Sequence, residues 1–336
     1  MMKKVAIVTI IDFNYGNRLQ NYALQTVLEK NGFSVQTLVF ENVNHAKKLK
    51  RLIQSYLKKN RYGAFLRFDR RIHFSNYSVN SGAPFPAYYM KVIAGSDQVW
   101  NIEFPDTNEN YFLAFAPVEK RFSYAASFGL SDGARYQNTV YQELLKEIPL
   151  ITVREKAGAE IIEKLTEKKA EVVLDPVFLL SREEWNTVAF SSIKRPKKPY
   201  IFCYFLGEYT SEYKEYIEKI AVEKQCEIFR LKPGMKDLSD DIGPAEFVDL
   251  LKNSVAVCAD SYHAIVFSMI YDKEAYLFSR KDDQGSMNSR FETLFNLFQI
   301  RMDEKKLLLY DRNLFKTKLV REKKKSIEIL LRGISQ

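Results

Sequence analysis

Short apolar segments alternate with helix-forming segments along most of this 336-residue chain, and this alternation restricts the possible folds more than any other feature. The chain opens with an expected strand at 4–11, a helix at 21–32 that Gly32 would stop, and a strand at 34–40. Further strands are expected at 200–207, 226–232 and 255–260. Strands joined through helices usually pair in parallel, so we predict an α/β fold with two Rossmann-like domains whose parallel sheets face a cleft.

One segment interrupts the alternation and suggests a domain boundary. SSIKRPKKPY (191–200) contains two prolines and four basic residues. We therefore expect an N-terminal α/β domain at 1–190, a C-terminal α/β domain at 199–313, and a basic helix at 314–336. That last helix is amphipathic and could pack on either domain or on a second subunit.

The composition indicates a globular protein without membrane spans. Hydrophobic residues make up 46% of the chain, but the longest apolar runs fall far short of the ~20 residues that a transmembrane helix needs. The N-terminal MMKKVAIVTIID imitates a signal peptide, yet its apolar run reaches Asp12 without a small-residue cleavage site. We interpret it as a first strand and expect a cytoplasmic protein.

Cysteine and histidine are scarce, which bears on metal binding. Cys203, Cys226 and Cys258 lie among apolar neighbours without CxxC spacing, as buried thiols of a reducing compartment do. The chain has three histidines, and no two have the close spacing of a zinc site. We expect no bound metal.

The formal charge of +9 is concentrated in a few segments. Residues 47–71 hold ten Lys or Arg against the single acid Asp69. Within 45–59, apolar residues recur at helical spacing with lysines on the remaining face. Such a helix either packs on the core with a solvated face or lies on an anionic membrane surface. Because the basic segments lack a recognisable module of interleaved stacking aromatics, we expect no nucleic-acid partner.

Polar residues cluster where the expected strands end, at 12–20, 95–101, 123–129 and 260–263. Loops that follow parallel strands carry the sites of α/β proteins. In the first cluster, Gly16 permits a close backbone approach to a ligand, and Asn17 or Asn21 could cap the following helix, whose N–H groups bind anions. A plain capped turn is the alternative reading.

Three further polar positions each allow a structural and a functional reading. Asp97 and Gln98 beside Trp100 suit sugar hydroxyls, or they belong to a buried polar network. Arg154 suits a carboxylate or phosphate, or it pairs with Glu155 or Asp175. We favour the capping of a local turn as the role of Asp175, which precedes a proline.

His263 follows a strand and precedes the apolar run AIVFSMI. It is either a hydrogen-bonded polar group in a buried helix or, with Asp260 and Ser261 nearby, a general acid or base. The residues alone leave both readings open.

Six motifs in order resemble the polysaccharide pyruvyl transferase family: NYGNRLQNYALQ, GSDQVWN, SYAASFG, TVREKAG, VLDPVFLL and ADSYHAIVFS. The resemblance covers residues 4–300. It implies a two-domain, GT-B-like architecture and transfer of the enolpyruvyl group of phosphoenolpyruvate onto a sugar, which forms a pyruvate ketal. It implies no metal and no cofactor, since phosphoenolpyruvate is the donor substrate.

The resemblance also implies roles for particular residues. His263 falls on the family's catalytic histidine, and the C-terminal domain becomes the donor side. The expected donor-binding residues are Arg154, Ser261, Arg280, Lys281 and Arg290. Independently of the resemblance, side chains that suit sugar hydroxyls make the N-terminal domain the expected acceptor side, and the expected binding residues there are Gly16, Asn17, Asp97 and Gln98. The family usually has glycine after the histidine, whereas this chain has Ala264, whose methyl group would narrow a close backbone approach.

We therefore expect a cytoplasmic pyruvyl transferase that modifies a polysaccharide or lipid-linked oligosaccharide precursor. A polyprenyl-linked acceptor would bring the protein to the inner face of the membrane, where the basic helix at 45–59 could contact anionic lipid. The alternatives are a nucleotide-sugar-dependent glycosyltransferase of GT-B type and a non-catalytic glycan-binding relative.

Overall fold

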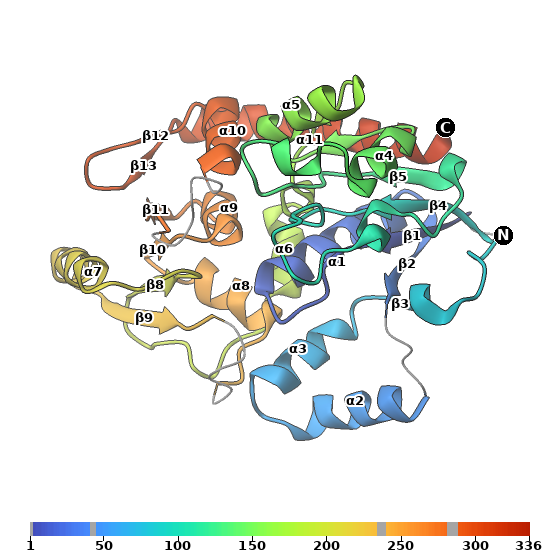
Figure 1. Ribbon diagram of the computed structural model, residues 1–336. Coiled ribbons are helices and arrows are strands. Elements are labelled where there is room, and N and C mark those ends of the chain that lie inside the picture. The colour runs from blue at the N-terminus through green and yellow to red at the C-terminus, as the bar shows by residue number, and fades with distance from the viewer. Residues whose placement is uncertain (1–2, 41–44, 234–239, 281–287) are drawn as a thin grey trace.

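The computed structural model describes residues 3–40, 45–233, 240–280 and 288–336, and it contains two parallel β-sheets flanked by helices (Figure 1). The N-terminal sheet has the strand order β3-β2-β1-β4-β5, with every neighbouring pair parallel. Its strands are β1 (Lys3–Val8), β2 (Phe33–Val39), β3 (Phe74–Ser78), β4 (Tyr89–Ala94) and β5 (Arg121–Ser123). The short parallel pair β6 (Thr152–Val153) and β7 (Glu171–Val172) joins this sheet through the bridge residue Ala126.

The helices of this half cover the sheet and its edge. They are α1 (Tyr15–Lys30), α2 (His45–Leu57), α3 (Arg61–Asp69), α4 (Val140–Glu147), α5 (Lys156–Thr166) and α6 (Arg182–Val188). Five short 3-10 turns connect them: η1 (Val79–Ser81), η2 (Glu109–Phe112), η3 (Val118–Lys120), η4 (Ala134–Tyr136) and η5 (Pro176–Leu179). Figure 1 shows α2 and α3 as a helical hairpin that projects beyond the edge of the sheet.

The C-terminal sheet is also parallel, in the order β11-β10-β8-β9. Its strands are β8 (Tyr200–Tyr204), β9 (Glu227–Leu231), β10 (Ala256–Ala259) and β11 (Glu274–Leu277). The helices of this half are α7 (Ser211–Glu223), α8 (Pro244–Lys252), α9 (Tyr262–Ile270) and α10 (Asn288–Phe298). A small antiparallel pair, β12 (Arg301–Met302) and β13 (Leu308–Leu309), precedes the 24-residue helix α11 (Arg312–Ser335).

Strand β1 lies in the middle of the N-terminal sheet and is buried on both faces. Val5, Ala6, Ile7 and Val8 have no exposed surface, and β1 pairs with β2 on one side and β4 on the other. A strand that is buried on both faces reads as a continuous apolar run, as this one does in the sequence. The predicted α/β class with parallel sheets is confirmed.

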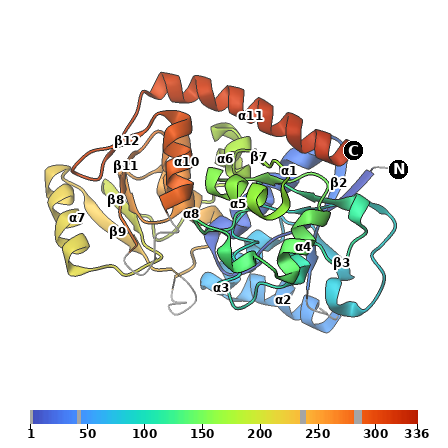
Figure 2. The same cartoon turned by 45° about the horizontal axis from the view of Figure 1, so that its top comes forward.

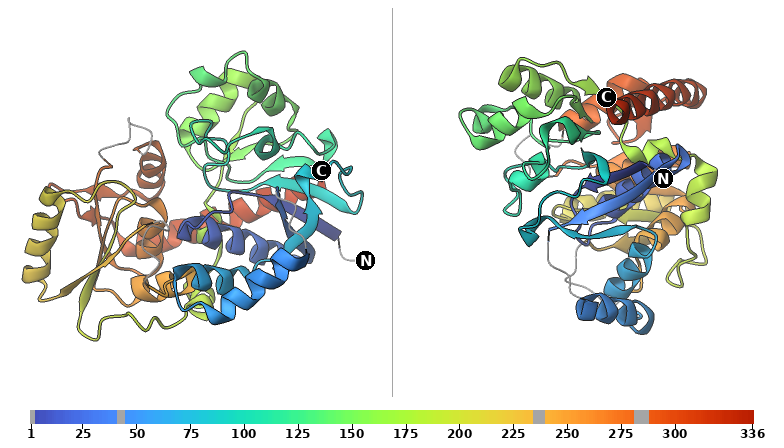
Figure 3. Two further views of the ribbon diagram at one scale, coloured as in Figure 1. Left: turned by 60° about the horizontal axis from the view of Figure 1, so that its bottom comes forward. Right: turned by 90° about the vertical axis from the view of Figure 1, so that its right-hand side faces the viewer.

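The two halves share one hydrophobic core. Its main cluster contains β1 residues, α1 residues and residues of β8, α8 and α9. The ring of Tyr15 stacks on Phe247 with 4.9 Å between centroids, and its hydroxyl donates to the carbonyl of Ile242 at 3.2 Å. Accordingly, α1 and α8 lie between the two sheets, with α7 on the far side of the C-terminal half (Figure 3).

Helix α11 returns from the C-terminal half to the N-terminal half, as Figure 2 shows. The hydroxyl of Ser326 accepts a hydrogen bond from the Leu174 amide at 3.0 Å, and Arg332 pairs with Glu171. Near its end, Gly333 lies so close to the ring of Phe122 that a Cβ atom there would overlap the ring. Helix α11 packs on both halves, because near its start Phe315 lies against Phe298 of α10 with 4.8 Å between ring centroids.

Candidate functional site

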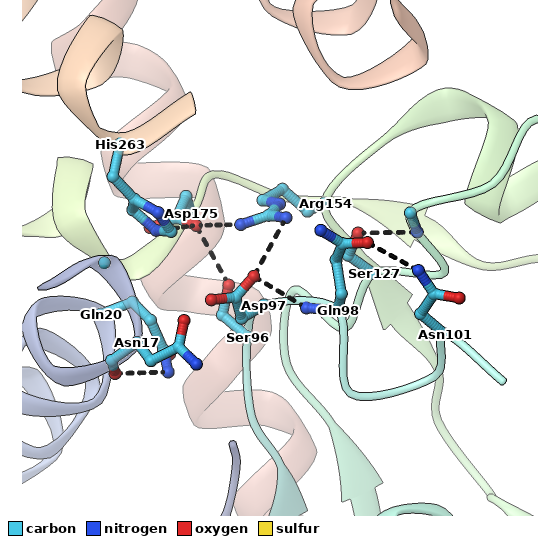
Figure 4. A network of polar contacts seen from close by, with 12 residues as sticks. Asn17, Gln20, Ser96, Asp97, Gln98, Asn101, Ser127, Arg154, Asp175 and His263 are labelled. Atoms are coloured by element: carbon cyan, nitrogen blue, oxygen red, sulfur yellow. Dashed lines mark hydrogen bonds and ion pairs between the residues drawn. The ribbon is translucent and has the colours of Figure 1, made fainter. Parts of the chain in front are cut away.

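Polar side chains from five segments meet where β1, β4, β6 and β7 end and α9 begins (Figure 4). The first turn of α1 supplies Asn17, and the loop after β4 supplies Ser96 and Asp97. Arg154 follows β6, and Asp175 follows β7. His263 comes from the first turn of α9, after β10 in the other sheet. The site therefore lies at the carboxyl ends of parallel strands, where α/β proteins bind their ligands.

His263 faces the carboxylate of Asp175. The distance from His263 Nε2 to Asp175 Oδ2 is 3.5 Å, which is long for a hydrogen bond but within ion-pair range when the imidazole is protonated. The carboxylate also accepts hydrogen bonds from Arg154 Nη1 at 2.8 Å and Ser96 Oγ at 3.1 Å. Burial alone would raise the pKa of Asp175, but His263 and Arg154 hold it well below its ordinary value. Asp175 is thus an anion that can orient the imidazole.

The other oxygen of Asp175 accepts a hydrogen bond from the Val177 amide at 2.9 Å and caps η5. The capping role that the sequence suggested is confirmed, and the structure adds the two cationic partners. A chain segment that turns at Pro176 thereby places one carboxylate against both His263 and Arg154.

Gly16 packs directly against the imidazole of His263, although 247 positions separate them in the chain. A Cβ atom at Gly16 would overlap the ring around Nδ1, so any side chain there would displace the histidine. The approach of the Gly16 backbone to a ligand stays a prediction, and what the structure shows is its contact with the histidine.

The cap of α1 differs from the predicted one. Asn14, with extended backbone angles, accepts hydrogen bonds from the amides of Gly16 at 2.9 Å and Asn17 at 3.4 Å. The prediction that Asn17 or Asn21 caps this helix is therefore wrong, because the helix begins at Tyr15. Asn17 instead donates from Nδ2 to Asp12 Oδ1 at 2.8 Å.

Arg154 is buried among groups that stabilise its charge. Its side chain is 1% exposed, and its guanidinium lies 4.6 Å from the ring centroid of Tyr262. Burial would lower the pKa of Arg154, but Asp175 and Asp97 raise it above its ordinary value. The ion pair with Asp175, which was the structural reading of Arg154, is present at 2.8 Å. Nε and Nη2 form no hydrogen bond with any residue that the structure describes, but Nη2 lies 3.7 Å from Asp97 and Nε lies 3.8 Å from Glu155, at ion-pair distance.

Asp97 and Gln98 form part of a local polar network. Asp97 has a left-handed φ of 74°, and its side chain accepts a hydrogen bond from the Gln98 amide at 2.9 Å. Its Oδ1 lies 3.7 Å from Arg154 Nη2. Gln98 Oε1 accepts from Asn101 Nδ2 at 2.8 Å, and it touches Gly129 so closely that a Cβ there would overlap it. Gln98 is therefore held in place by structural contacts, whereas Asp97 also faces the arginine.

Two more arginines belong to the same electrostatic environment. Arg280 Nε lies 3.5 Å from Asp260 Oδ2, and Asp260 is itself held by the amides of Leu206 and Gly207. Arg290 from α10 is buried; that burial and the nearby charge of Arg154 lower its pKa to about 10. The repulsion between Arg154 and Arg290 makes the surroundings of Arg290 favourable for a bound anion.

The remaining expected residues are less informative. Ser261 precedes α9 and is buried, but its side chain does not cap the helix. Lys281 lies outside the described residues. Ala264 is fully buried within the hydrophobic core that the two halves share.

Asp12 was not among the predicted site residues, although it is the first charged residue after β1. Its carboxylate accepts hydrogen bonds from the Asn14 amide at 3.0 Å and from Asn17 Nδ2. Asp12 reaches solvent, yet the surrounding protein atoms desolvate the carboxylate and raise its pKa above the ordinary value. The position at a strand end was a usable signal. The desolvation of its carboxylate could not be predicted from the sequence, because it depends on distant segments.

The described residues show neither a cluster of metal ligands nor a membrane-spanning helix. Among the side chains described, no three His, Cys, Asp or Glu residues gather as a metal site would require. Within the same parts of the chain, none of the helices combines the length and apolar character needed to cross a bilayer.

Solved structures with a similar fold are distant in sequence. A putative UDP-N-acetylglucosamine 2-epimerase from Listeria monocytogenes is 13% identical, with a TM-score of 0.52 over 98% of this chain and 90% of that chain. The UDP-GlcNAc 2-epimerase of Methanocaldococcus jannaschii, in complex with UDP-GlcNAc and UDP, is also 13% identical, with a TM-score of 0.50 over 99% of each chain. The likeness concerns the fold alone, which is of the GT-B type.

Sequence comparison gives the family. No curated protein sequence matches this chain. The profile of the family described as polysaccharide pyruvyl transferase matches residues 14–282, which include His263, Arg154 and the loop around Gly16. The chain belongs to the polysaccharide pyruvyl transferase family.

Proposed function

We propose that the protein transfers the enolpyruvyl group of phosphoenolpyruvate to two hydroxyls of a sugar, forming a pyruvate ketal and inorganic phosphate. The observation that carries this proposal is the cluster in which His263 faces the ionised Asp175 beside the buried Arg154. A proton donor is thus placed next to a cationic group that suits the carboxylate or phosphate of the donor.

The reaction needs a proton at the enol carbon first. His263, as imidazolium paired with Asp175, would donate that proton to C3 of phosphoenolpyruvate, which leaves a cation at C2. One sugar hydroxyl adds to C2 and loses its proton to a base. The second hydroxyl then adds as the C2–O bond to phosphate breaks, and its proton leaves with the phosphate or with solvent.

The arginines would stabilise the charges of the donor. An incoming carboxylate would compete with Glu155 for Nε of Arg154 and with Asp97 for Nη2. Arg280 and Arg290 add positive charge on the side of α9 and α10. Preorganised cations beside a departing phosphate lower the cost of the charge that develops on it. Ser261 and Lys281 remain candidate donor-binding residues.

The acceptor sugar would bind on the N-terminal side, near Gly16, Asn17, Asp97 and Gln98. Asp12 is well suited to take the hydroxyl proton, because a carboxylate with a raised pKa is a stronger base. The acceptor would be a polysaccharide or a polyprenyl-linked precursor, handled on the cytoplasmic side of the membrane. No metal or further cofactor takes part in this scheme.

Calorimetric titration of phosphoenolpyruvate tests the donor. We expect binding by the wild type, no binding by Arg154→Ala, and unchanged binding by Arg135→Ala, whose side chain is mostly exposed at 68%. Thermal unfolding of each variant separates lost binding from lost folding. Binding of a nucleotide sugar but not of phosphoenolpyruvate would instead favour a glycosyltransferase.

Turnover tests the histidine. His263→Asn should release no phosphate from phosphoenolpyruvate with candidate acceptors, whereas His73→Asn, at an exposed position beside Glu29, should match the wild type. A wild type that binds the donor and a sugar but never forms a ketal would indicate a glycan-binding relative without catalysis.

A further inference from the structure

A large cavity lies beside the candidate site, between the projecting helices α2 and α3 and the ends of β1, β2 and β3. Its volume is about 1190 Å³, above the range of ~300–1,000 Å³ typical of small-molecule pockets. Most of the wall is apolar, with contributions from Leu38, Phe40, Leu49, Leu52 and Phe74. There is room for a polar head and part of an apolar chain.

The cavity wall also carries positive charge. Arg18, Arg51 and Arg70 line it, and Asp69 is the one acidic residue among its lining residues. The Arg18 side chain is 4% exposed, and its Nε pairs with Asp69 at 2.6 Å. Its Nη1, however, is buried and forms no hydrogen bond with any residue that the structure describes. A buried donor without a partner is costly, so this atom favours a bound acceptor such as phosphate oxygen.

The apolar wall continues onto an exposed face of α2. Leu49, Leu52, Ile53, Tyr56 and Leu57 are between 46% and 75% exposed. An apolar face of this kind beside basic residues suits a long apolar chain that carries an anionic group. The cavity thus has an apolar exit on one side and Arg18 on the other.

The cavity reaches the candidate site through the loop after β1. Ile11 and Phe13 line the cavity, and Asp12 stands between them in the chain. Arg18 follows Gly16 by two residues on α1, and Gly16 touches His263. A sugar attached to a phosphate at Arg18 would therefore extend toward Asp12 and Asn17.

We propose that this cavity binds the lipid phosphate of the acceptor, that is, a phosphate ester of a long apolar alcohol to which the sugar is linked. The phosphate lies at Arg18, and the chain follows Leu49 and Leu52 toward the exposed face of α2. This assignment rests on the proposed function for its sugar. The binding of the lipid phosphate itself can be measured without any reaction.

The test uses farnesyl phosphate below its micelle concentration as a probe, with farnesol and inorganic phosphate as controls, in calorimetric titrations. We expect farnesyl phosphate to bind at least tenfold more tightly than either control. Leu52→Glu should weaken it at least tenfold, and Arg18→Gln with Asp69→Asn should reduce it to the level of farnesol. Val320→Glu, at an exposed apolar position on α11, is the matched control and should bind as the wild type does.

Several results would overturn the assignment: no binding of farnesyl phosphate, equal binding of farnesol, or full binding by Leu52→Glu. Binding to vesicles of phosphatidylglycerol without binding of monomeric farnesyl phosphate would also overturn it, and would make α2 a bilayer contact instead. Phosphoenolpyruvate titrated into the same variants separates the two proposals. If farnesyl phosphate does not bind but phosphoenolpyruvate still binds to Leu52→Glu as to the wild type, the assignment of the cavity is wrong. If the wild type does not bind phosphoenolpyruvate, the proposed function is wrong.

Discussion

Replacing Asp175 with asparagine removes the charge that His263 and Arg154 share while preserving the shape of the side chain. The Asp175 side chain is fully buried and lies 2.8 Å from Arg154 Nη1 and 3.5 Å from His263 Nε2. Removing one partner of a buried ion pair destabilises a protein by roughly 3–5 kcal/mol, because the other charge stays buried. Arg154 keeps Asp97 and Glu155 within 4 Å, so we expect the lower end, about 3 kcal/mol.

This loss should depend on pH in a defined direction. The folded pKa of Asp175 is depressed, so its contribution to the free energy of unfolding is fully present above the unfolded pKa of about 3.9. The contribution is lost as the pH falls through the lower, folded pKa. The difference between wild type and Asp175→Asn should therefore be full at pH 7 and shrink below about pH 4.

Urea unfolding followed by tryptophan fluorescence measures this difference. Trp185 Nε1 donates to the carbonyl of Val177 at 3.0 Å, in the turn that Asp175 caps, so one of the two tryptophans reports on the site directly. Asp132→Asn, at an exposed position, controls for charge removal. A difference below about 1 kcal/mol at pH 7, or one that is equal at pH 7 and pH 3.5, would refute the reasoning.

Three further changes test the site. Asp12→Asn should raise the melting temperature at pH 7, because a carboxylate with a raised folded pKa contributes stability only in acid and loses it as the pH rises. The gain in melting temperature should vanish near pH 3.5, and an equal gain at both pH values would contradict this reasoning. Gly16→Ala should cost about 1–3 kcal/mol in urea unfolding and abolish phosphate release, since its methyl group overlaps the imidazole of His263; wild-type turnover would show that the contact is dispensable. Ala264→Gly should lower the free energy of unfolding by about 1 kcal/mol or more, because the methyl group of Ala264 is buried in the core. The affinity for phosphoenolpyruvate, measured by calorimetry, should stay unchanged, and tighter binding would contradict this prediction.

The local patterns of the sequence were enough to predict the α/β class and several elements. The apolar run expected at 4–11 forms β1, and the amphipathic segment expected at 45–59 forms α2. These elements follow from periodicity, which depends on near neighbours only. The polar cluster at 123–129 begins at the end of the three-residue strand β5, and an isolated bridge at Ala126 continues the pairing, which periodicity does not indicate.

Side-chain partners far apart in the chain could not be predicted in the same way. The capping of η5 by Asp175 is local and was anticipated, whereas its contact with His263 depends on how two sheets meet. The identity of the α1 cap was missed because Asn14, Asn17 and Asn21 are chemically equivalent, and only backbone angles distinguish them. The desolvation of Asp12 likewise arises from segments that the fold brings together.

The hydrophobic core that joins the two halves restricts how this chain can be divided. Tyr15 is stacked on Phe247, and α11 spans back to Phe122, so a cut within 191–200 would leave apolar surface bare on both fragments. Neither fragment would retain a complete hydrophobic core. In the intact chain, the two halves should therefore unfold in one cooperative transition. Exchange of one half between relatives would therefore require the matching faces of α1, α8 and α11 to be exchanged as well.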